Sequence, residues 1–96
     1  MDTGDYCFRL FIAGDEPNSR LAEENLRALC LKYLAGRHHI EVIDVIENFE
    51  AALALQILVA PAVVMDSPRR VTLFGALTDE ATVMAALGLK GAQHQS

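Results

Sequence analysis

The chain has 96 residues, 52% of them hydrophobic, and its 13 acidic and 8 basic side chains give a net charge of -5. This length predicts a single domain over residues 1–96, large enough to fold independently. The acidic balance argues against a nucleic-acid partner and against attraction to anionic lipid. No apolar run reaches the ~18 residues that a membrane span requires, and residues 1–5 lack the basic start of a signal peptide, so the sequence predicts a cytoplasmic protein.

The first half of the chain predicts a strand, a helix and a second strand. Residues 6–13 are apolar on both faces of a strand except at Arg9, which is typical of a central strand in a parallel sheet. Asn18 or Ser19 is expected to cap a helix over about 19–34. Its core stripe recurs at helical spacing and consists of Ala22, Leu26, Leu29, Cys30 and Tyr33. Residues 39–46 are rich in β-branched side chains but interrupted by acids, which predicts a less buried strand, parallel to the first.

The second half predicts a helix, a hairpin and a final helix. Asn48 is expected to cap a short helix over about 50–57. A third strand is expected over residues 59–65, with Pro61 near its start. A turn over 66–69 leads to a strand over 70–74, so these two strands should form a hairpin. Thr78 is expected to cap a helix over 79–87, and residues 1–5 and 90–96 should be flexible.

The predicted order, β-α-β-α-β-β-α, is that of an α/β thioredoxin-like fold with a mixed four-stranded sheet. In such folds the proline that begins the third strand is usually cis and faces the first strand-to-helix turn, so Pro61 is expected to do so. That turn is also where a Cys-x-x-Cys pair would lie. Here residues 14–19 contain no thiol, and carboxylates, amides and hydroxyls cannot replace a thiolate in disulfide exchange. The pattern therefore favours binding over redox chemistry.

The cysteine, histidine and carboxylate side chains are the candidates for chemistry. Cys7 and Cys30 could form a redox pair, but Cys30 lies on the apolar stripe, where a thiol serves as a small hydrophobic group. His38 and His39 are adjacent in a strand and so point to opposite faces, which disfavours a shared metal. The adjacent carboxylates of the first turn have no enclosed pocket to separate their pKa values for acid–base work. The sequence thus predicts no catalytic residue, cofactor or metal site.

Several ordered segments resemble the KaiB circadian-clock family. Residues 10–19 (LFIAGDEPNS) are similar to the family's apolar strand followed by Ala-Gly-x-x-Pro-Asn-Ser, and residues 42–48 (VIDVIEN) resemble its second strand. Residues 57–61 (ILVAP) are similar to its Ile-Leu-Ala-Thr-Pro segment. Pro68-Arg-Arg70, Phe74-Gly75 and Leu77 resemble its Pro-x-Arg-Arg and Gly-Asp-Leu region. The resemblance covers about residues 8–89.

The resemblance implies a non-enzymatic partner of KaiC, a hexameric RecA-type ATPase, docking in a thioredoxin-like state. Some family members also rest as tetramers in another fold, so a dimer or tetramer of this chain is a further expectation. The expected partner-binding residues fall in three places. They are the first turn, the start of the third strand and the hairpin: Asp15, Glu16, Pro17, Asn18, Ser19, Pro61, Arg69 and Arg70. Two alternative functions stay open. One is a sensor module of a histidine-kinase pathway, as in the N-terminal domain of SasA, and the other is a thiol-redox protein. An alternative interpretation is that Arg69 and Arg70 simply belong to a solvated turn.

Overall fold

The computed structural model describes residues 5–57 and 59–89. The elements follow in the order β1 (Tyr6–Ile12), α1 (Pro17–Tyr33), β2 (His38–Asp44), α2 (Phe49–Ala54), β3 (Ala62–Ser67), β4 (Val71–Phe74) and α3 (Glu80–Leu87). This is the predicted order, and the helix over 80–87 agrees with the predicted final helix. The predicted flexible ends lie almost wholly outside the described residues. At Asp5, the backbone carbonyl accepts a 2.9 Å hydrogen bond from the Ser67 hydroxyl.

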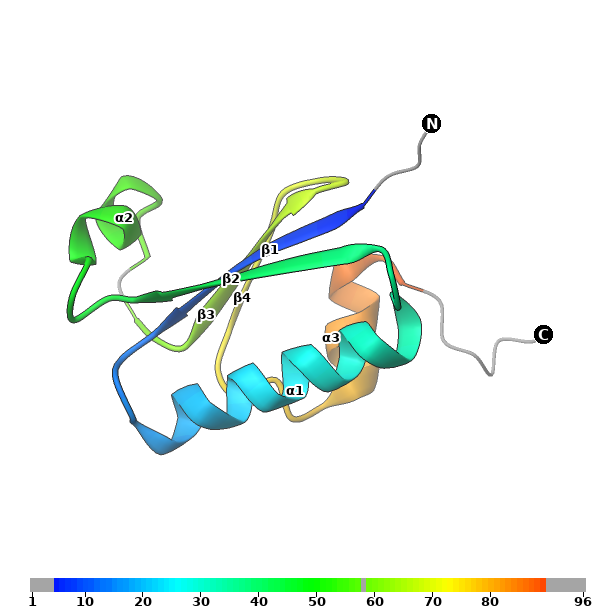
Figure 1. Ribbon diagram of the computed structural model, residues 1–96, viewed down its shortest axis with the longest axis horizontal. Helices are drawn as coiled ribbons and strands as arrows, with labels where there is room; N and C mark the ends of the chain where they lie inside the picture. The colour runs from blue at the N-terminus through cyan, green and yellow to red at the C-terminus, as the bar shows by residue number, and fades with distance from the viewer. Residues whose placement is uncertain (1–4, 58, 90–96) are drawn as a thin grey trace.

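The four strands form one mixed sheet in the order β2-β1-β3-β4 (Figure 1). β1 lies parallel to β2 and antiparallel to β3, and β3 and β4 form the predicted antiparallel hairpin. β1 is therefore central and β2 is an edge strand, which explains why acidic residues interrupt the apolar pattern of β2. Phe11 lies opposite Ala62, so the end of β1 and the start of β3 meet at the same end of the sheet.

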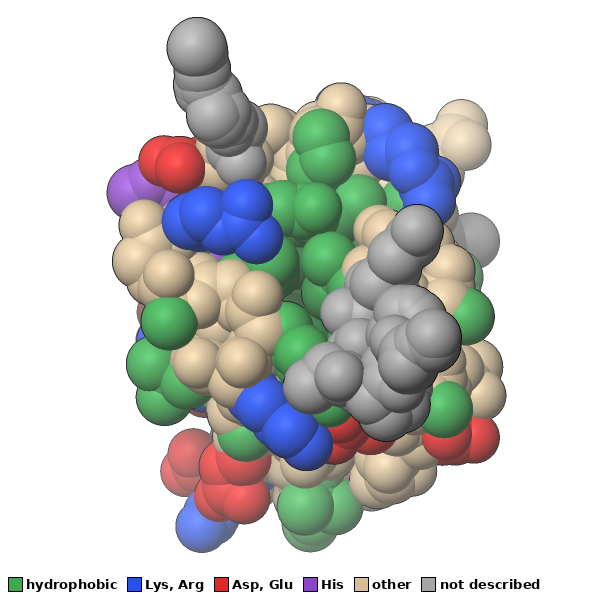
Figure 2. Space-filling model, turned by 90° about the vertical axis from the view of Figure 1, so that its right-hand side faces the viewer, with side chains coloured by type: hydrophobic (Ala, Val, Ile, Leu, Met, Phe, Trp, Pro, Cys, Tyr) green, Lys and Arg blue, Asp and Glu red, His purple; other side chains and the backbone are tan. Residues whose placement is uncertain are grey.

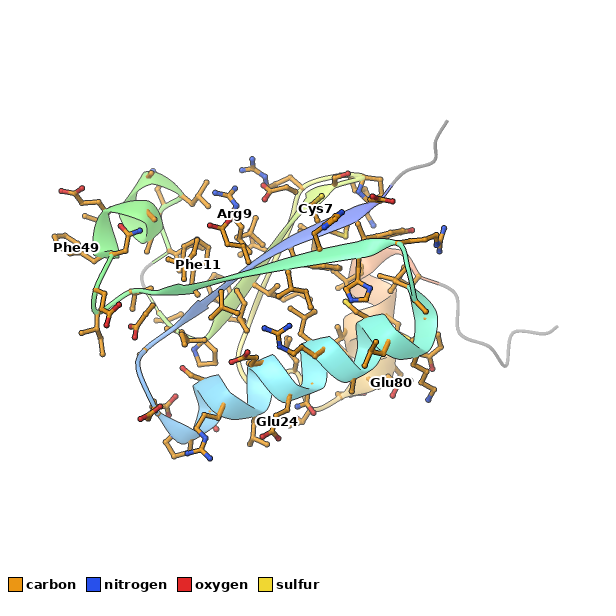
Figure 3. The ribbon with its side chains drawn as sticks, viewed as in Figure 1. Cys7, Arg9, Phe11, Glu24, Phe49 and Glu80 are labelled. Atoms are coloured by element: carbon orange, nitrogen blue, oxygen red, sulfur yellow. The ribbon has the colours of Figure 1, made fainter. Side chains whose placement is uncertain are left out.

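Helices cover the two faces of the sheet unequally. α1 and α3 pack on one face, where their buried residues join Phe8, Leu10, Val63 and Met65 in the main core. The short helix α2 lies on the other face, over a smaller core made of Phe11, Ala52, Ile57, Ala62 and Val64. Figure 1 shows α2 over one end of the sheet, while α1 and α3 lie on the opposite side. The part of the second face beyond α2 carries Cys7 and Arg9, which Figure 3 shows pointing to the same side as α2.

Helix boundaries differ from the prediction where capping was assigned to the wrong side chain. α1 begins at Pro17, and its cap is Glu16, whose carboxylate accepts a 2.9 Å hydrogen bond from the Ser19 amide. Proline suits the first helical position because its missing N–H has no partner there in any case. Asp79, and not Thr78, caps α3 by accepting hydrogen bonds from the amide and hydroxyl of Thr82.

The end of α2 and the peptide bonds before two prolines also bear on the predictions. α2 ends at Ala54, earlier than predicted, because Gln56 adopts a left-handed backbone with φ of 60°. The Ala60–Pro61 bond is cis, as expected, and Ser67–Pro68 is also cis. Within residues 5–57 and 59–89, no helix combines the length and the apolar character that crossing a bilayer requires.

Candidate functional site

The first turn, the loop after β2, helix α2 and the segment before β3 meet at one end of the sheet, here called the first-turn end. The Asp44 carboxylate joins two of these segments, because one oxygen accepts hydrogen bonds from the amides of Gly14 (3.2 Å) and Ile46 (2.9 Å). Gly14 has φ of 57°, and a Cβ there would lie 3.3 Å from the Ile46 side chain. The glycine thus lets the two loops approach closely. The sequence analysis missed this role of Asp44, although an Asp that bonds the amide two residues on is a known turn signal.

The first-turn end exposes an unusual amount of apolar surface. Ile46, Phe49, Leu53 and Val59, here called the apolar patch, are 52–70% exposed. Figure 3 shows Phe49 pointing outward from α2, whereas Phe11 lies beneath the helix. The patch adjoins a hollow of about 250 Å³ lined by Val45, Phe49, Ala52, Leu53, Ile57, Val59 and Ala60. Large exposed apolar clusters mark interaction surfaces on soluble proteins, and the sequence analysis did not single out these four residues.

The predicted binding residues of the first turn divide between surface and interior. Asp15, Glu16, Pro17 and Asn18 are exposed. Ser19 has no exposed surface, and its hydroxyl accepts a 3.0 Å hydrogen bond from the Ala13 amide. The Ser19 side chain therefore offers no surface to a partner in this structure, because it holds the turn together.

Pro61 lies at the same end of the sheet as the first turn. It comes directly before β3, and its carbonyl accepts a 2.9 Å hydrogen bond from the Gly75 amide. Since Ala62 pairs with Phe11, Pro61 is close to the end of β1, where the first turn starts. The structure thus brings Pro61 close to the first turn, as expected, but Pro61 is buried and offers a partner little surface.

Arg69 and Arg70 lie at the other end of the sheet, here called the hairpin end. β1 runs between the two ends and spans about 20 Å. Arg69 donates a 3.5 Å hydrogen bond to the Ala86 carbonyl in the last turn of α3, and Arg70 pairs with Asp66 at 3.2 Å. The structure therefore does not join the arginine pair to the first turn in one site.

Asp66 is the centre of a charged cluster on the uncovered part of the second face. Arg9 donates two hydrogen bonds of 2.7 Å to its carboxylate, and Arg70 adds a third contact. The hydrogen bonds from Arg9, supported by the charges of both arginines, lower the pKa of Asp66 against the opposing effect of burial. The Arg9 side chain thus has a partner even though it interrupts the apolar pattern of β1.

Replacement of Asp66 by Asn should reduce the free energy of unfolding by about 1 kcal/mol at pH 7, because Arg9 loses its charged partner. A carboxyl whose pKa is lowered by folding stabilises the protein above its unfolded pKa, and this contribution is lost as the pH falls through the folded pKa. Urea unfolding from pH 7 down to pH 3 should therefore show a smaller loss of stability in D66N than in wild type. Parallel curves for the two proteins would contradict this assignment.

The two cysteines lie on opposite faces of the sheet and are both free. Cys30 is fully buried in the main core, and burial raises the pKa of its thiol to about 12. Cys7 is half-buried on the second face. The two cannot pair without unfolding, because the sheet separates them.

The histidines of β2 bind different partners. Nδ1 of His38 lies 2.8 Å from the Leu34 carbonyl, and Nε2 of His39 lies 3.3 Å from the Asp5 carboxylate. Among the residues that the structure describes, no group of three or more His, Cys, Asp or Glu side chains could hold a metal ion.

Solved structures define the class of this protein as thioredoxin-like. The N-terminal domain of SasA from Synechococcus elongatus matches with a TM-score of 0.75 and 20% identity, covering 98% of this chain and 93% of that one. Mitochondrial thioredoxin 3 from Saccharomyces cerevisiae matches with a TM-score of 0.69 and 17% identity, covering 91% of this chain and 81% of that one. These likenesses confirm the predicted fold.

The sequence comparisons go further. The family model of the KaiB domain matches residues 9–89. The circadian clock oscillator protein KaiB of Prochlorococcus marinus strain MIT 9313 is 34% identical over 85 residues, covering 88% of this chain and 71% of that protein. The circadian clock protein KaiB3 of Synechocystis is 31% identical over 68 residues, covering 71% of this chain and 67% of that one. This chain belongs to the KaiB family.

Proposed function

We propose that this protein acts in the cytoplasm as a non-enzymatic regulator that binds a KaiC-type hexameric ATPase. Membership of the KaiB family supports the proposal, and the observation that carries it is the apolar patch beside the first turn and Pro61. Phe49 and Leu53 of this patch lie on α2, which has six residues and covers only one end of this sheet face (Figure 1). A surface of this kind gains free energy when a partner removes it from water.

The proposed docking surface comprises the apolar patch with Asp15, Glu16, Pro17 and Asn18, and the buried Pro61 supports it from beneath the surface. Arg69 and Arg70 would form a second contact, reached only by a partner that extends about 20 Å along the sheet. A short peptide would reach only one of these two contacts, whereas a large ATPase could reach both.

The chemistry of the first turn supports a binding role over a redox role. The turn that would carry the reactive thiols in a thioredoxin contains none, and Cys30 is buried with a raised pKa, which leaves almost no thiolate at neutral pH. A dimer or tetramer of this chain stays a prediction, which light scattering coupled to size-exclusion chromatography would test.

The test is a titration of the KaiC-type ATPase of the same organism with this protein, in ATP and in ADP at fixed salt. A ligand that regulates a nucleotide-driven enzyme must bind its states with different affinity. We expect a clear difference between the two nucleotides, and at least tenfold weaker binding for Phe49→Ala. The matched control is Leu31→Ala, which truncates a 67% exposed side chain on α1 and should leave binding unchanged.

Equal affinity in ATP and ADP would contradict a regulatory role. Absence of binding at tens of micromolar would contradict the KaiC-type partner and favour the sensor module of a histidine-kinase pathway. An insulin-reduction assay would expose a thiol-redox activity, which the proposal excludes.

A further inference from the structure

We infer that the first-turn end recognises a partner segment that presents a large apolar side chain flanked by Lys or Arg. This rests on the proposed function only in taking the first-turn end as the docking surface, and it adds the chemistry of the segment that docks there. Two independent features carry the inference: the hollow in the apolar patch and the distribution of charge around it.

The hollow selects an apolar side chain. All of its lining residues are hydrophobic, and its volume of about 250 Å³ exceeds that of one leucine or phenylalanine side chain. Phe49 and Leu53 stand one helical turn apart on α2 and form one wall of the hollow. An aliphatic or aromatic anchor placed here would bury Phe49 and Leu53 together with itself, as hot-spot residues do.

The loops beside the hollow are acidic. The two stretches that build the first-turn end, residues 13–19 and 44–61, contain five carboxylates and no Lys or Arg side chain: Asp15, Glu16, Asp44, Glu47 and Glu50. Asp15, Glu47 and Glu50 are exposed, and none of the three makes an ion pair with any residue that the structure describes. Glu47 follows Ile46 and Glu50 follows Phe49, so these carboxylates flank the apolar patch in the chain.

Arg9 lies on the same face of the sheet as α2, opposite Val64 of the smaller core, and is paired with Asp66. Arg37 stacks over Tyr6 at the start of β1, Arg69 contacts the end of α3 and Arg70 follows the β3–β4 turn, so all three belong to the hairpin end. Figure 2 looks onto the side of the molecule away from α2 and shows several Lys and Arg side chains around a hydrophobic centre. Arg20, in the first turns of α1, is the only Lys or Arg between residues 10 and 26. The exposed charges of the loops beside the patch are thus acidic, whereas Arg37, Arg69 and Arg70 lie at the opposite end, where acidic side chains are present as well (Figure 2).

This polarity determines which partner segments can dock. Basic side chains beside the anchor would lie within a Debye length of these exposed carboxylates, which raises the rate of association and favours the correct orientation. Acidic side chains at the same positions would be repelled, so the carboxylates also exclude wrong partners. Burial of the anchor in the apolar hollow provides the affinity, and the carboxylates discriminate between basic and acidic segments.

The test uses two synthetic peptides that share the same Leu and Phe anchors and differ only in their flanking residues, four Lys in one and four Glu in the other. Titrations monitored by fluorescence anisotropy at 50 mM NaCl should show at least tenfold tighter binding of the Lys-flanked peptide to the wild-type protein. Phe49→Ala should weaken binding of this peptide at least tenfold. At 300 mM NaCl the preference should narrow, because salt screens exposed charges.

Charge reversal supplies the decisive comparison. Glu50→Lys should weaken the Lys-flanked peptide several-fold and strengthen the Glu-flanked one. Glu24→Lys changes the net charge equally, but its site is on α1, on the other side of the sheet from Phe49 (Figure 3), and it should alter either affinity less than twofold. Unfolding curves of the variants confirm that each is folded at the assay temperature.

Three results would overturn the inference: equal binding of the two peptides, equal effects of E50K and E24K, or no binding of either peptide at 1 mM concentration, about the weakest affinity such a site would show. The peptide titrations contain no ATPase, so they can succeed where the ATPase titration fails. In that case the docking chemistry stands and the KaiC-type partner is wrong. Conversely, nucleotide-dependent ATPase binding without a peptide preference would remove this inference alone.

Discussion

Replacement of Phe11 by Ala is expected to lower the free energy of unfolding by about 3–5 kcal/mol. Phe11 has no exposed surface and lies between α2 and the sheet, so its ring is the largest buried contact of the smaller core. Small domains are stable by only about 5–15 kcal/mol, so the loss would be a large share of the total. Urea unfolding followed by circular dichroism measures it directly.

The matched control for Phe11→Ala is Phe49→Ala. The same ring is removed, but Phe49 is 59% exposed, and its loss should change stability by less than about 0.5 kcal/mol. The two variants therefore distinguish folding from binding. Phe11 holds α2 on the sheet, whereas Phe49 is exposed on α2 for contact with a partner. Similar losses of stability in the two variants would contradict the placement of α2 over Phe11.

Replacement of Ser19 by Ala should cost about 1 kcal/mol or more, because the partly buried Ala13 amide would be left without its acceptor. The affinity for a partner, corrected for the folded fraction, should stay the same. Thermal or urea unfolding together with a binding titration at a temperature where the variant is folded would measure both quantities.

Asn18→Ala provides the comparison for Ser19, since Asn18 is its exposed neighbour in the same turn. We expect no measurable loss of stability from this change and a weaker interaction with the partner. A loss of stability in N18A as large as that in S19A would show that the turn is not held by the serine hydroxyl as described.

Much of the fold could be predicted from the sequence because strand and helix periodicities are local signals. The buried stripe of α1 and the hairpin of β3 and β4 are examples. Helix starts were less predictable, since Glu16 caps α1 although Asn18 and Ser19 have a better intrinsic preference, and at α3 Thr78 and Asp79 are both capping residues. Which oxygen reaches the free amides depends on the path of the chain into the helix.

The candidate site was predicted only in part, because its composition depends on topology. The pairing of β1 with β3 brings Pro61 to the first turn and carries Arg69 and Arg70 to the far end of the sheet. Burial of Ser19 depends on its bond to Ala13, which the sequence does not reveal. The apolar patch was not predicted, because the sequence does not distinguish an exposed Phe or Ile from a buried one. The position of α2 decides which of these side chains is exposed.

The separation of the two cores has a consequence for motion. α2 has six residues, well below the length at which an isolated helix persists in water, and it is held by the smaller core alone. Opening of this helix would break few of the contacts that hold β1 between β2 and β3, so its amides should exchange with deuterium through local fluctuations while those of β1 require global unfolding. The surface that meets a partner can therefore change shape while the rest of the molecule remains native.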